Sequence, residues 1–497
     1  MKKILFKIIT ALMLISFFTS CGKQKRTNDV VRMNLSSEPD SFFPWKSSAA
    51  DTKAILFNIY EGLMTFDSKG AIKLCLAKNV AVDKTGLEYT FTIRDDVYFH
   101  NGKKLTGEDV LYTYENLAGL NGNTPKSDEM QIIKNAYLKD EHTFIVELKN
   151  PSASFLTFAI QPILQKGYDD NENLPVGTGP YKFAGYEIHQ KVTLEKNENY
   201  WNTQREGKIK TIELYVISDE ASCISAIQSD QLDIAQMLMS GNAKTLSNKF
   251  NLVMYPQNMV QIFAMNNAIE PFNNPKVRKA ICLAINRDEI ISGAMDNAGT
   301  PLYSNFSPIL NVFYNDKLTQ VNQFNIEKAK ELLKEAGYEN GFDLTITVPS
   351  NYAVHVDTAQ IIAGQLEKIN IRCKINGIEW TTWLSDVYSN RQYETTVIAF
   401  GGKLEPNDIL KRYVSTYKRN FVGFKNEQFD DYFTQALTEL NEVKRIELYK
   451  ECQRILAEEC PCAFICDPNN TLLIKKNLKG FTYYPISFYD FSSLYFE

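Results

Sequence analysis

The chain has 497 residues, of which 44% are hydrophobic and 23% charged, with 54 lysines and arginines against 59 aspartates and glutamates. This length suggests about three domains of roughly 150 residues each. The formal net charge of −5 lacks the basic footprint of a nucleic-acid-binding protein. Aromatic residues make up 12% of the chain, which excludes a largely disordered protein. A mean hydropathy of −0.27 excludes a polytopic membrane protein.

The N-terminus has the pattern of an export signal. Three lysines precede an apolar run over residues 8–18, and small residues come just before Cys21. This order is typical of a secretory signal peptide, and the run is about half as long as the roughly 20 residues that span a membrane. Its ending resembles a bacterial lipoprotein signal, whereas a plain secretory signal with an unrelated cysteine is the alternative. We predict a cleaved signal peptide over 1–20, lipid attachment at Cys21 and a polar tether over 21–29.

Beyond the tether, short strands alternate with amphipathic helices. Strands are expected over 30–35 and 89–93, where apolar residues dominate or alternate with polar ones. Thr106 has an acid three residues later, which is a capping box before a helix. Further helices begin at Pro275 and after Asn325, each with an apolar face. The pattern predicts an α/β or α+β protein rather than an all-β one.

Eight cysteines follow Cys21, and their pairing cannot be deduced from spacing. They form neither a disulfide framework nor a zinc pattern, although an exported protein permits disulfides. If 460–466 is a strand, Cys460, Cys462 and Cys466 share one face. Burial as small hydrophobic side chains is one interpretation, which also suits Cys452. A redox or metal role is the other.

Catalytic motifs are missing, so an enzyme is not expected, nor is a metal or cofactor. The sequence has no nucleophile elbow, zinc-protease helix, phosphate-binding loop or dinucleotide fingerprint. The run 177–180 has two glycines, but its proline lacks the amide that would bind phosphate, which favours a tight turn. His100 precedes an Asn-Gly pair, and a structural hydrogen bond is favoured over catalysis.

An ordered series of segments identifies a family. The series includes YTFTIR, FHNGKKLTGEDV, GTGPY, NENYW, VRKA and AINR, which lie at 89–94, 99–110, 177–181, 197–201, 277–280 and 284–287. In this order they resemble the family 5 extracellular solute-binding proteins, which are dipeptide-, oligopeptide- and nickel-binding receptors of ABC importers. The resemblance covers roughly residues 30–497.

The resemblance implies an α/β fold with two lobes closing like a clamshell and an extra inserted α+β domain. It divides the chain into lobe one at 27–60, 176–263 and 467–497, the inserted domain at 61–175, and lobe two at 264–466. It also implies an exported monomer that is lipid-anchored at the cell envelope. Such a receptor captures a small solute, most simply a peptide-like one, in a cleft and delivers it to a permease and ATPase complex.

The resemblance places the ligand contacts less firmly. Peptide-binding members hold the ligand's α-ammonium with an aspartate four residues before a proline, and here Gly402 stands four residues before Pro406. Either Glu405 or Asp408 replaces the aspartate, or the glycines let a ligand approach the backbone while Lys403 faces an anionic group. The predicted ligand-binding residues are Trp45, Trp380, Trp383, Gly401, Gly402, Lys403, Glu405 and Asp408, although Trp383 suits a core position and Gly401-Gly402 a simple turn equally well.

Other functions are open at the level of sequence. A signalling or sensing receptor without a transport partner is one alternative, and neighbouring permease and ATPase genes would favour the importer receptor over it. A metal chelate or a glycan could replace the peptide as ligand. An extracytoplasmic enzyme is disfavoured because the nucleophile and metal motifs are missing.

Overall fold

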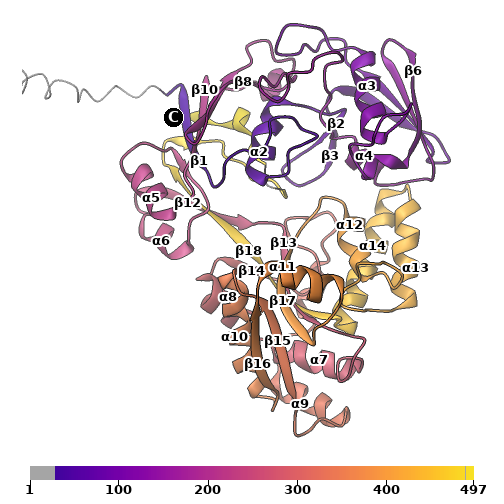
Figure 1. Cartoon of the computed structure of the whole chain (residues 1–497), viewed down its shortest axis with the longest axis vertical. Coiled ribbons are helices and arrows are strands. Elements are labelled where there is room, and N and C mark those ends of the chain that lie inside the picture. Colours follow the sequence, from indigo (N-terminus) through magenta and orange to yellow (C-terminus); the bar gives the residue numbers. More distant parts are fainter. Residues whose placement is uncertain (1–27, 487) are drawn as a thin grey trace, which may run out of the picture.

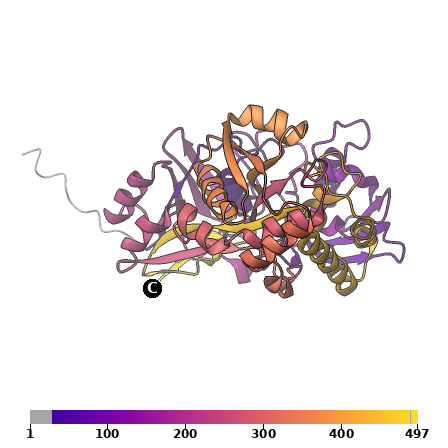
Figure 2. The ribbon, with the colours of Figure 1, turned by 90° about the horizontal axis from the view of Figure 1, so that it is seen from below.

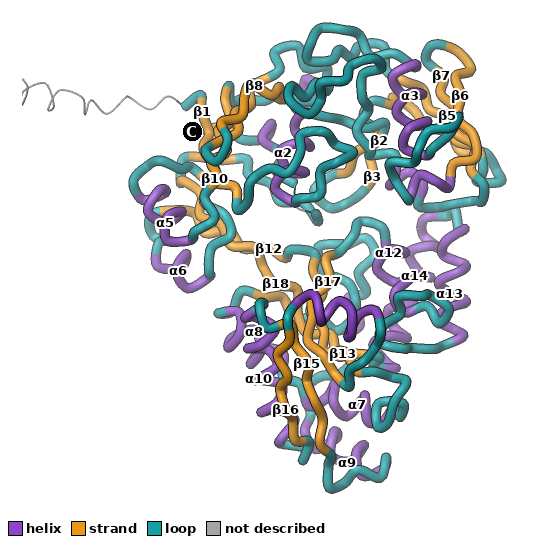
Figure 3. Tube along the Cα trace, viewed as in Figure 1, coloured by secondary structure: helices purple, strands orange, loops and turns teal. Residues whose placement is uncertain are grey.

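Two lobes make up the molecule, with the first lobe above the second in Figure 1. The computed structural model describes residues 28–486 and 488–497. Helices and strands are mixed in both lobes, as Figure 3 shows by colour. The predicted signal peptide, Cys21 and most of the tether lie outside the described residues.

The first lobe is built on a mostly apolar sheet. Its strands are β1 (Val30–Leu35), β8 (Tyr181–Glu187), β9 (Lys191–Lys196), β10 (Thr211–Val216), β11 (Ile234–Ala235) and β12 (Phe250–Pro256). Its helices are α2 (Ala50–Ile59), α5 (Glu220–Gln228) and α6 (Ser240–Thr245), with the 3-10 turn η2 (Thr203–Arg205). Strand β1 is parallel to β10 and β11, whereas β9 and β8 continue the sheet in antiparallel register. Val31 and Met33 of β1 are fully buried because this strand lies in the middle of the sheet.

The chain between α2 and β8 forms a separate unit with its own core. Its strands are β2 (Met64–Phe66), β3 (Ile72–Leu74), β4 (Ala77–Val82), β5 (Glu88–Ile93), β6 (Ile133–Asp140) and β7 (Thr143–Leu148). Its helices are α3 (Gly107–Ala118) and α4 (Phe155–Phe158), with the 3-10 turn η1 (Glu129–Ile132). An antiparallel sheet has the order β4-β5-β7-β6. Helix α3 covers it, packing Val110, Tyr114 and Leu117 into the core.

The second lobe has three parallel strands at one edge of the sheet, followed by antiparallel strands. Its strands are β13 (Met259–Met265), β14 (Gly299–Pro301), β15 (Asp343–Pro349), β16 (Arg372–Ile378), β17 (Thr395–Gly401) and β18 (Cys462–Lys475). The longer helices are α7 (Pro275–Ala284), α8 (Arg287–Met295), α9 (Ile326–Glu335), α10 (Ala353–Glu367), α13 (Glu427–Thr438) and α14 (Glu442–Glu459). Shorter ones are α11 (Trp380–Thr382), the π-helix η4 (Trp383–Ser389), α12 (Pro406–Leu410), and the 3-10 turns η3 (Asp316–Gln320) and η5 (Lys411–Tyr413).

One strand joins the two lobes. Strand β18 pairs with β12 over its C-terminal half and with β13 over its N-terminal half, so the sheet order is β16-β15-β17-β13-β18-β11-β1-β10-β9-β8. Figure 2 shows β18 in yellow running across the molecule. Beyond it the chain ends in β19 (Leu478–Lys479), the 3-10 turn η6 (Phe491–Ser493) and β20 (Tyr495–Phe496). The lobe boundaries predicted at 263 and 467 fall inside β13 and β18, because both strands belong to this shared sheet.

The predicted local signals are confirmed where they rest on side-chain capping. Thr106 N and Oγ1 both donate to Asp109 Oδ2, at 2.8 and 2.7 Å, and thereby close the capping box of α3. Pro275 is the first residue of α7. The Asn325 side chain accepts a hydrogen bond from Lys328 N at the start of α9. Each cap satisfies backbone N–H groups that have no partner within the helix.

The expectation that Cys460, Cys462 and Cys466 share one face of a strand is wrong. Cys460 and Cys466 pack in the core of α7 and α8, whereas Cys462 packs on the opposite side of the sheet. Two local features break the alternation: Cys460 ends α14 in a left-handed conformation, and the pairing of β13 with β18 skips one residue between Cys466 and Phe464. A bulge of this kind reverses which side the following residues face. No disulfide links the described cysteines.

Candidate functional site

A buried network joins the first lobe to the inserted unit through residues of two sequence motifs. The Glu61 carboxylate accepts hydrogen bonds from four side chains, and three of the donors lie in the GTGPY or NENYW segment. These three are Thr178 Oγ1 at 2.9 Å, Tyr200 OH at 2.7 Å and Trp201 Nε1 at 2.8 Å, and the fourth is Cys75 Sγ at 3.5 Å. A buried carboxylate needs such partners. These motifs therefore stabilise the scaffold.

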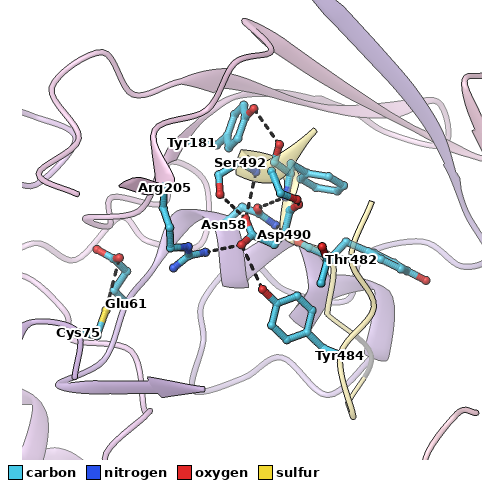
Figure 4. A network of polar contacts seen from close by, with 12 residues as sticks. Asn58, Glu61, Cys75, Tyr181, Arg205, Thr482, Tyr484, Asp490 and Ser492 are labelled. Atoms are coloured by element: carbon cyan, nitrogen blue, oxygen red, sulfur yellow. Dashed lines mark hydrogen bonds and ion pairs between the residues drawn. The ribbon is translucent and has the colours of Figure 1, made fainter. Parts of the chain in front are cut away.

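A neighbouring set of polar contacts ties the C-terminal segment to the first lobe (Figure 4). Arg205 and Tyr484 both point toward Asp490 and donate to its carboxylate, at 3.0 and 3.2 Å. The Asn58 side chain bonds the backbone on either side of Asp490, at 2.7 and 3.0 Å. These groups find their partners inside the protein, which marks the network as structural.

His100 is also structural, as the sequence predicted. Its Nε2 lies 3.0 Å from Gly179 O, and Gly177 N donates to its Nδ1 at 3.4 Å. Burial lowers the pKa of His100 to about 4. The imidazole is therefore neutral at pH 7 and its two nitrogens are engaged with the backbone.

Parallel strands bring the predicted ligand residues to the facing ends of the lobes. In the first lobe β10 and β11 run parallel to β1, and in the second lobe β16 and β17 run parallel to β15. Ligands of open α/β sheets bind outside the carboxyl ends of such strands. Trp45 follows β1, Trp380 follows β16, and the loop 401–408 begins at the end of β17. In Figure 1, α11 and α12 lie at the edge of the second lobe that faces the first.

Gly402 has no room for a side chain. Its N–H donates to Asn258 O at 2.5 Å, and Asn258 lies between β12 and β13, where the chain passes from one lobe to the other. A Cβ at Gly402 would overlap the side-chain and backbone oxygens of Asn258, whereas a Cβ at Gly401 would meet no atom within 4 Å. A side chain at Gly402 would therefore collide with the connection between the lobes.

The two acids of the loop have partners within the second lobe. Glu405 is 3% exposed, lies 3.7 Å from Arg445 Nη1 and accepts a hydrogen bond from Tyr449 OH at 3.5 Å. Burial raises the pKa of Glu405, and Arg445 opposes that rise. Asp408 accepts a hydrogen bond from Lys411 Nζ at 2.5 Å. In this conformation each carboxylate already lies beside a cation of the second lobe, so neither is free to pair with a ligand's ammonium.

Lys403 differs from these acids. Its side chain is exposed, and within the described part of the chain it forms no ion pair. Its backbone oxygen accepts a long hydrogen bond from Asn258 Nδ2, at 3.5 Å. The lysine therefore extends from a loop whose backbone is held against the connection between the lobes.

The predicted tryptophans of the second lobe have different environments. Trp383 is only 1% exposed, and its Nε1 donates to Thr396 Oγ1 at 3.0 Å, so it belongs to the core. Trp380 is half-buried and stacks on Trp383, with ring centroids 5.3 Å apart and planes within 4° of parallel. Tyr352, which is 41% exposed, meets Trp380 edge to face at 5.3 Å. Trp380 and Tyr352 form an aromatic platform at the ends of β15 and β16.

Trp45 lies at the joint between the first lobe and the inserted unit. Its ring packs against both cores and lies 5.2 Å from Phe43 and 6.3 Å from Tyr112. Its Nε1 is buried and has no hydrogen-bond partner among the described residues. A buried indole N–H usually has a partner, so Trp45 is an exception among the described residues.

A small pocket beneath Gly401 and Gly402 contains two polar residues that the sequence analysis missed. Asn305 is 1% exposed, and neither its Oδ1 nor its Nδ2 has a hydrogen-bond partner among the described residues. Arg412 lies across from it, with its guanidinium 4.4 Å from the centroid of the Phe400 ring. Asn305 follows β14 in an irregular segment, and Arg412 lies in a short 3-10 turn. No periodicity or motif marks either residue.

Within residues 28–486 and 488–497 no group of histidine, cysteine, aspartate and glutamate is arranged to hold a metal ion. None of the helices in these ranges is long and apolar enough to cross a membrane.

Sequence comparison assigns this scaffold to a family. The family model for bacterial extracellular solute-binding proteins, family 5, matches residues 71–421, which is well over half of the chain. The chain belongs to this family. Members are substrate-binding proteins of ABC importers that act outside the cytoplasm. The family match confirms the predicted family, and the structure confirms its two-lobed fold.

Individual relatives and solved structures are similar to this chain over nearly its whole length. Oligopeptide-binding protein AppA of Bacillus subtilis is 26% identical, and the match covers 94% of this chain and 91% of AppA. The unliganded open form of the murein tripeptide-binding protein MppA superimposes with a TM-score of 0.83 at 21% identity, over 95% of this chain and 98% of MppA. The Helicobacter pylori protein DppA, in complex with the peptide STSA, gives a TM-score of 0.71 at 25% identity, over 96% and 100% of the two chains.

Proposed function

We propose that this family 5 protein is the receptor of an ABC importer, and that it captures a peptide-like or other small solute between its lobes for delivery to permease and ATPase subunits. The main support is the family match over residues 71–421. The facing carboxyl ends of the parallel strands supply loops from both lobes, as a ligand held between lobes requires. Relatives named for oligopeptide binding make a peptide the first ligand to test.

The proposal includes an anchored, exported monomer that binds without catalysis. Lipidation at Cys21 would hold the folded body at the cell envelope through the tether at 21–29, and two acyl chains are enough for stable anchoring. A Cys21→Ala variant should therefore be recovered in the soluble fraction of the envelope. Membrane retention equal to that of the wild type would contradict the anchor while leaving ligand binding untouched.

We also propose that the protein does not bind the free α-ammonium of a peptide through an aspartate, as peptide-binding members of the family do. Gly402 stands at the position of the expected aspartate and has no space for a side chain. Glu405 is committed to Arg445, and Asp408 to Lys411. Loss of one charge-assisted hydrogen bond of about 1.5–3 kcal/mol weakens binding roughly tenfold or more.

The test uses the full-length protein and a defined probe. Native mass spectrometry should first identify any co-purified solute, and the emptied protein should then be offered a random tetrapeptide library with free or N-acetylated N-termini. We expect intact peptides of both kinds to be retained to similar extents. Retention of free peptides alone would show that another acid holds the ammonium. Cleaved peptides would contradict a pure binding role, and retention of neither library would contradict peptide binding.

A further inference from the structure

We infer that the pocket beneath Gly401 and Gly402 is a carboxylate-binding subsite in which Arg412 and Asn305 hold an anionic group of the ligand. This inference rests on the proposed function and adds the chemical group of the ligand that the second lobe binds. The pocket is lined by Val260, Asn305, Phe400, Gly401, Gly402, Ile409, Arg412 and Tyr413.

Asn305 is the first observation that points to a ligand. Its side chain is buried, yet both its donor and its acceptor lack partners among the described residues. Buried polar groups in folded proteins are almost always hydrogen-bonded. A carboxamide left unsatisfied on both sides, in a pocket at the end of β17, is arranged to bind a molecule that supplies both an acceptor and a donor.

Arg412 is the second, independent observation. No carboxylate neutralises its guanidinium within the described part of the chain, and no hydrogen bond from it is formed there. Asp408, the nearest acid in sequence, is paired with Lys411 instead. The Phe400 ring covers one face of the Arg412 guanidinium. The N–H groups of the guanidinium lie in its plane, where a carboxylate can accept two parallel hydrogen bonds.

The shape of the pocket limits what can enter. Its volume is about 10 Å³, which holds roughly one water-sized atom. One oxygen of a carboxylate fits this space while the rest of the group lies against the Gly401–Gly402 backbone. Gly401 offers no side chain that would block the approach.

The two residues together favour a particular ligand group. Arg412 and Asn305 Nδ2 can both donate to the one carboxylate oxygen that fits the pocket. The C-terminal residue of a peptide, or an N-acylated amino acid, carries such a carboxylate. An ammonium is disfavoured because it would be repelled by Arg412.

The test compares a random tetrapeptide library bearing free C-termini with the same library as C-terminal amides, measured by native mass spectrometry on the full-length protein. Wild type should prefer the acids by about tenfold, the effect of one charge-assisted hydrogen bond. Arg412→Gln should reduce this preference to near one, whereas Lys403→Gln, which removes a neighbouring exposed cation, should reduce it much less. The reverse order for these two variants, or equal retention of acids and amides by wild type, would overturn the inference.

A second pair of variants keeps the test decisive if Arg412→Gln does not fold. Gly401→Asp places a carboxylate of the protein itself beside Arg412, at a position where a Cβ meets no atom, and it should abolish the preference for acids. Gly401→Asn has the same shape without the charge and should weaken binding of acids and amides alike. An equal loss of preference in both variants would show a steric effect and contradict the subsite.

If wild type retains neither library, the proposed peptide-binding function fails and a separate probe decides the subsite. Acetate should then raise the melting temperature of wild type above that measured in chloride at equal ionic strength, because a ligand that binds only the folded state stabilises it. Arg412→Gln should lose this increase. The absence of an acetate effect in wild type would overturn the subsite as well.

Discussion

Gly402 shows how one residue constrains the candidate site. Its Cβ would overlap oxygens of Asn258, so we expect Gly402→Ala to destabilise the protein by about 1–3 kcal/mol, as overpacking does. Gly401→Ala is the matched control because a Cβ there meets no atom within 4 Å. In a chain of this size the difference corresponds to a fall in melting temperature of about 1–3 °C. Equal melting temperatures for the two variants would contradict the predicted overlap.

The sequence predicted a loop at 401–408, whereas the structure has only residues 402–405 between β17 and α12, and the sequence could not assign the roles of these residues. The spacing to Pro406 identified Gly402, while the reason for the glycine lies in Asn258, more than a hundred residues away. The partner of Glu405 comes from α14, and the stacking of Trp380 on Trp383 depends on a π-helical turn. Side-chain partners from distant segments leave no local pattern, which is also why Asn305 and Arg412 were missed.

At the scale of elements, the connection between the lobes is held by a buried carboxylate. Asp467 lies in β18, and its Oδ1 accepts hydrogen bonds from Gln257 N at 3.0 Å and Met259 N at 3.1 Å. These donors flank the turn from β12 to β13. Burial raises the pKa of Asp467 to about 7, although the Ser307 hydroxyl and the backbone N–H groups lower it.

This carboxyl predicts a pH-dependent stability. Because the pKa of Asp467 is about 7 in the folded state and 3.8 without burial, the folded protein holds a proton that the unfolded chain releases between pH 4 and 7. Stability from this group therefore falls as pH rises through that window and is constant above it. The shift of about three pKa units sets an upper limit of roughly 4 kcal/mol.

The measurement is the melting temperature from pH 4 to 8. Asp467→Asn imitates the protonated acid, so its melting temperature should rise relative to wild type as pH increases to 7 and then stay level. Asp169→Asn, which removes an exposed carboxylate far from β18 in sequence, is the control. A difference between Asp467→Asn and wild type that does not vary with pH would contradict a neutral, buried Asp467.

Helix starts with local capping signals could be predicted from the sequence, whereas irregular features that depend on another strand could not. The caps of α3, α7 and α9 use side chains within three residues of the helix start, so sequence alone identified them. The cysteine alternation failed at β18 because the left-handed end of α14 and the skipped residue opposite β13 depend on pairing with another strand.

At the scale of the whole molecule, the ordered family segments predicted the two-lobed fold, but they did not predict where the lobes touch. The inserted unit contacts the second lobe near α4, where Arg445 donates to Ala153 O at 3.1 Å and Asn407 donates to Ser154 Oγ at 3.0 Å. Figure 1 places this contact on the side of the molecule away from β12 and β18. The first lobe also contacts the second near α6, where Lys244 Nζ donates to Asp296 O at 3.1 Å.

A ligand that contacts both lobes should favour a closed arrangement, because a ligand shifts the equilibrium toward the state that it binds more tightly. We expect X-ray scattering to give a smaller radius of gyration for wild type with the free-acid tetrapeptide library than without it. Arg412→Gln under the same conditions is the control, since it should bind little and change little. Binding verified by native mass spectrometry with an unchanged radius of gyration would show that this receptor captures its solute without closing.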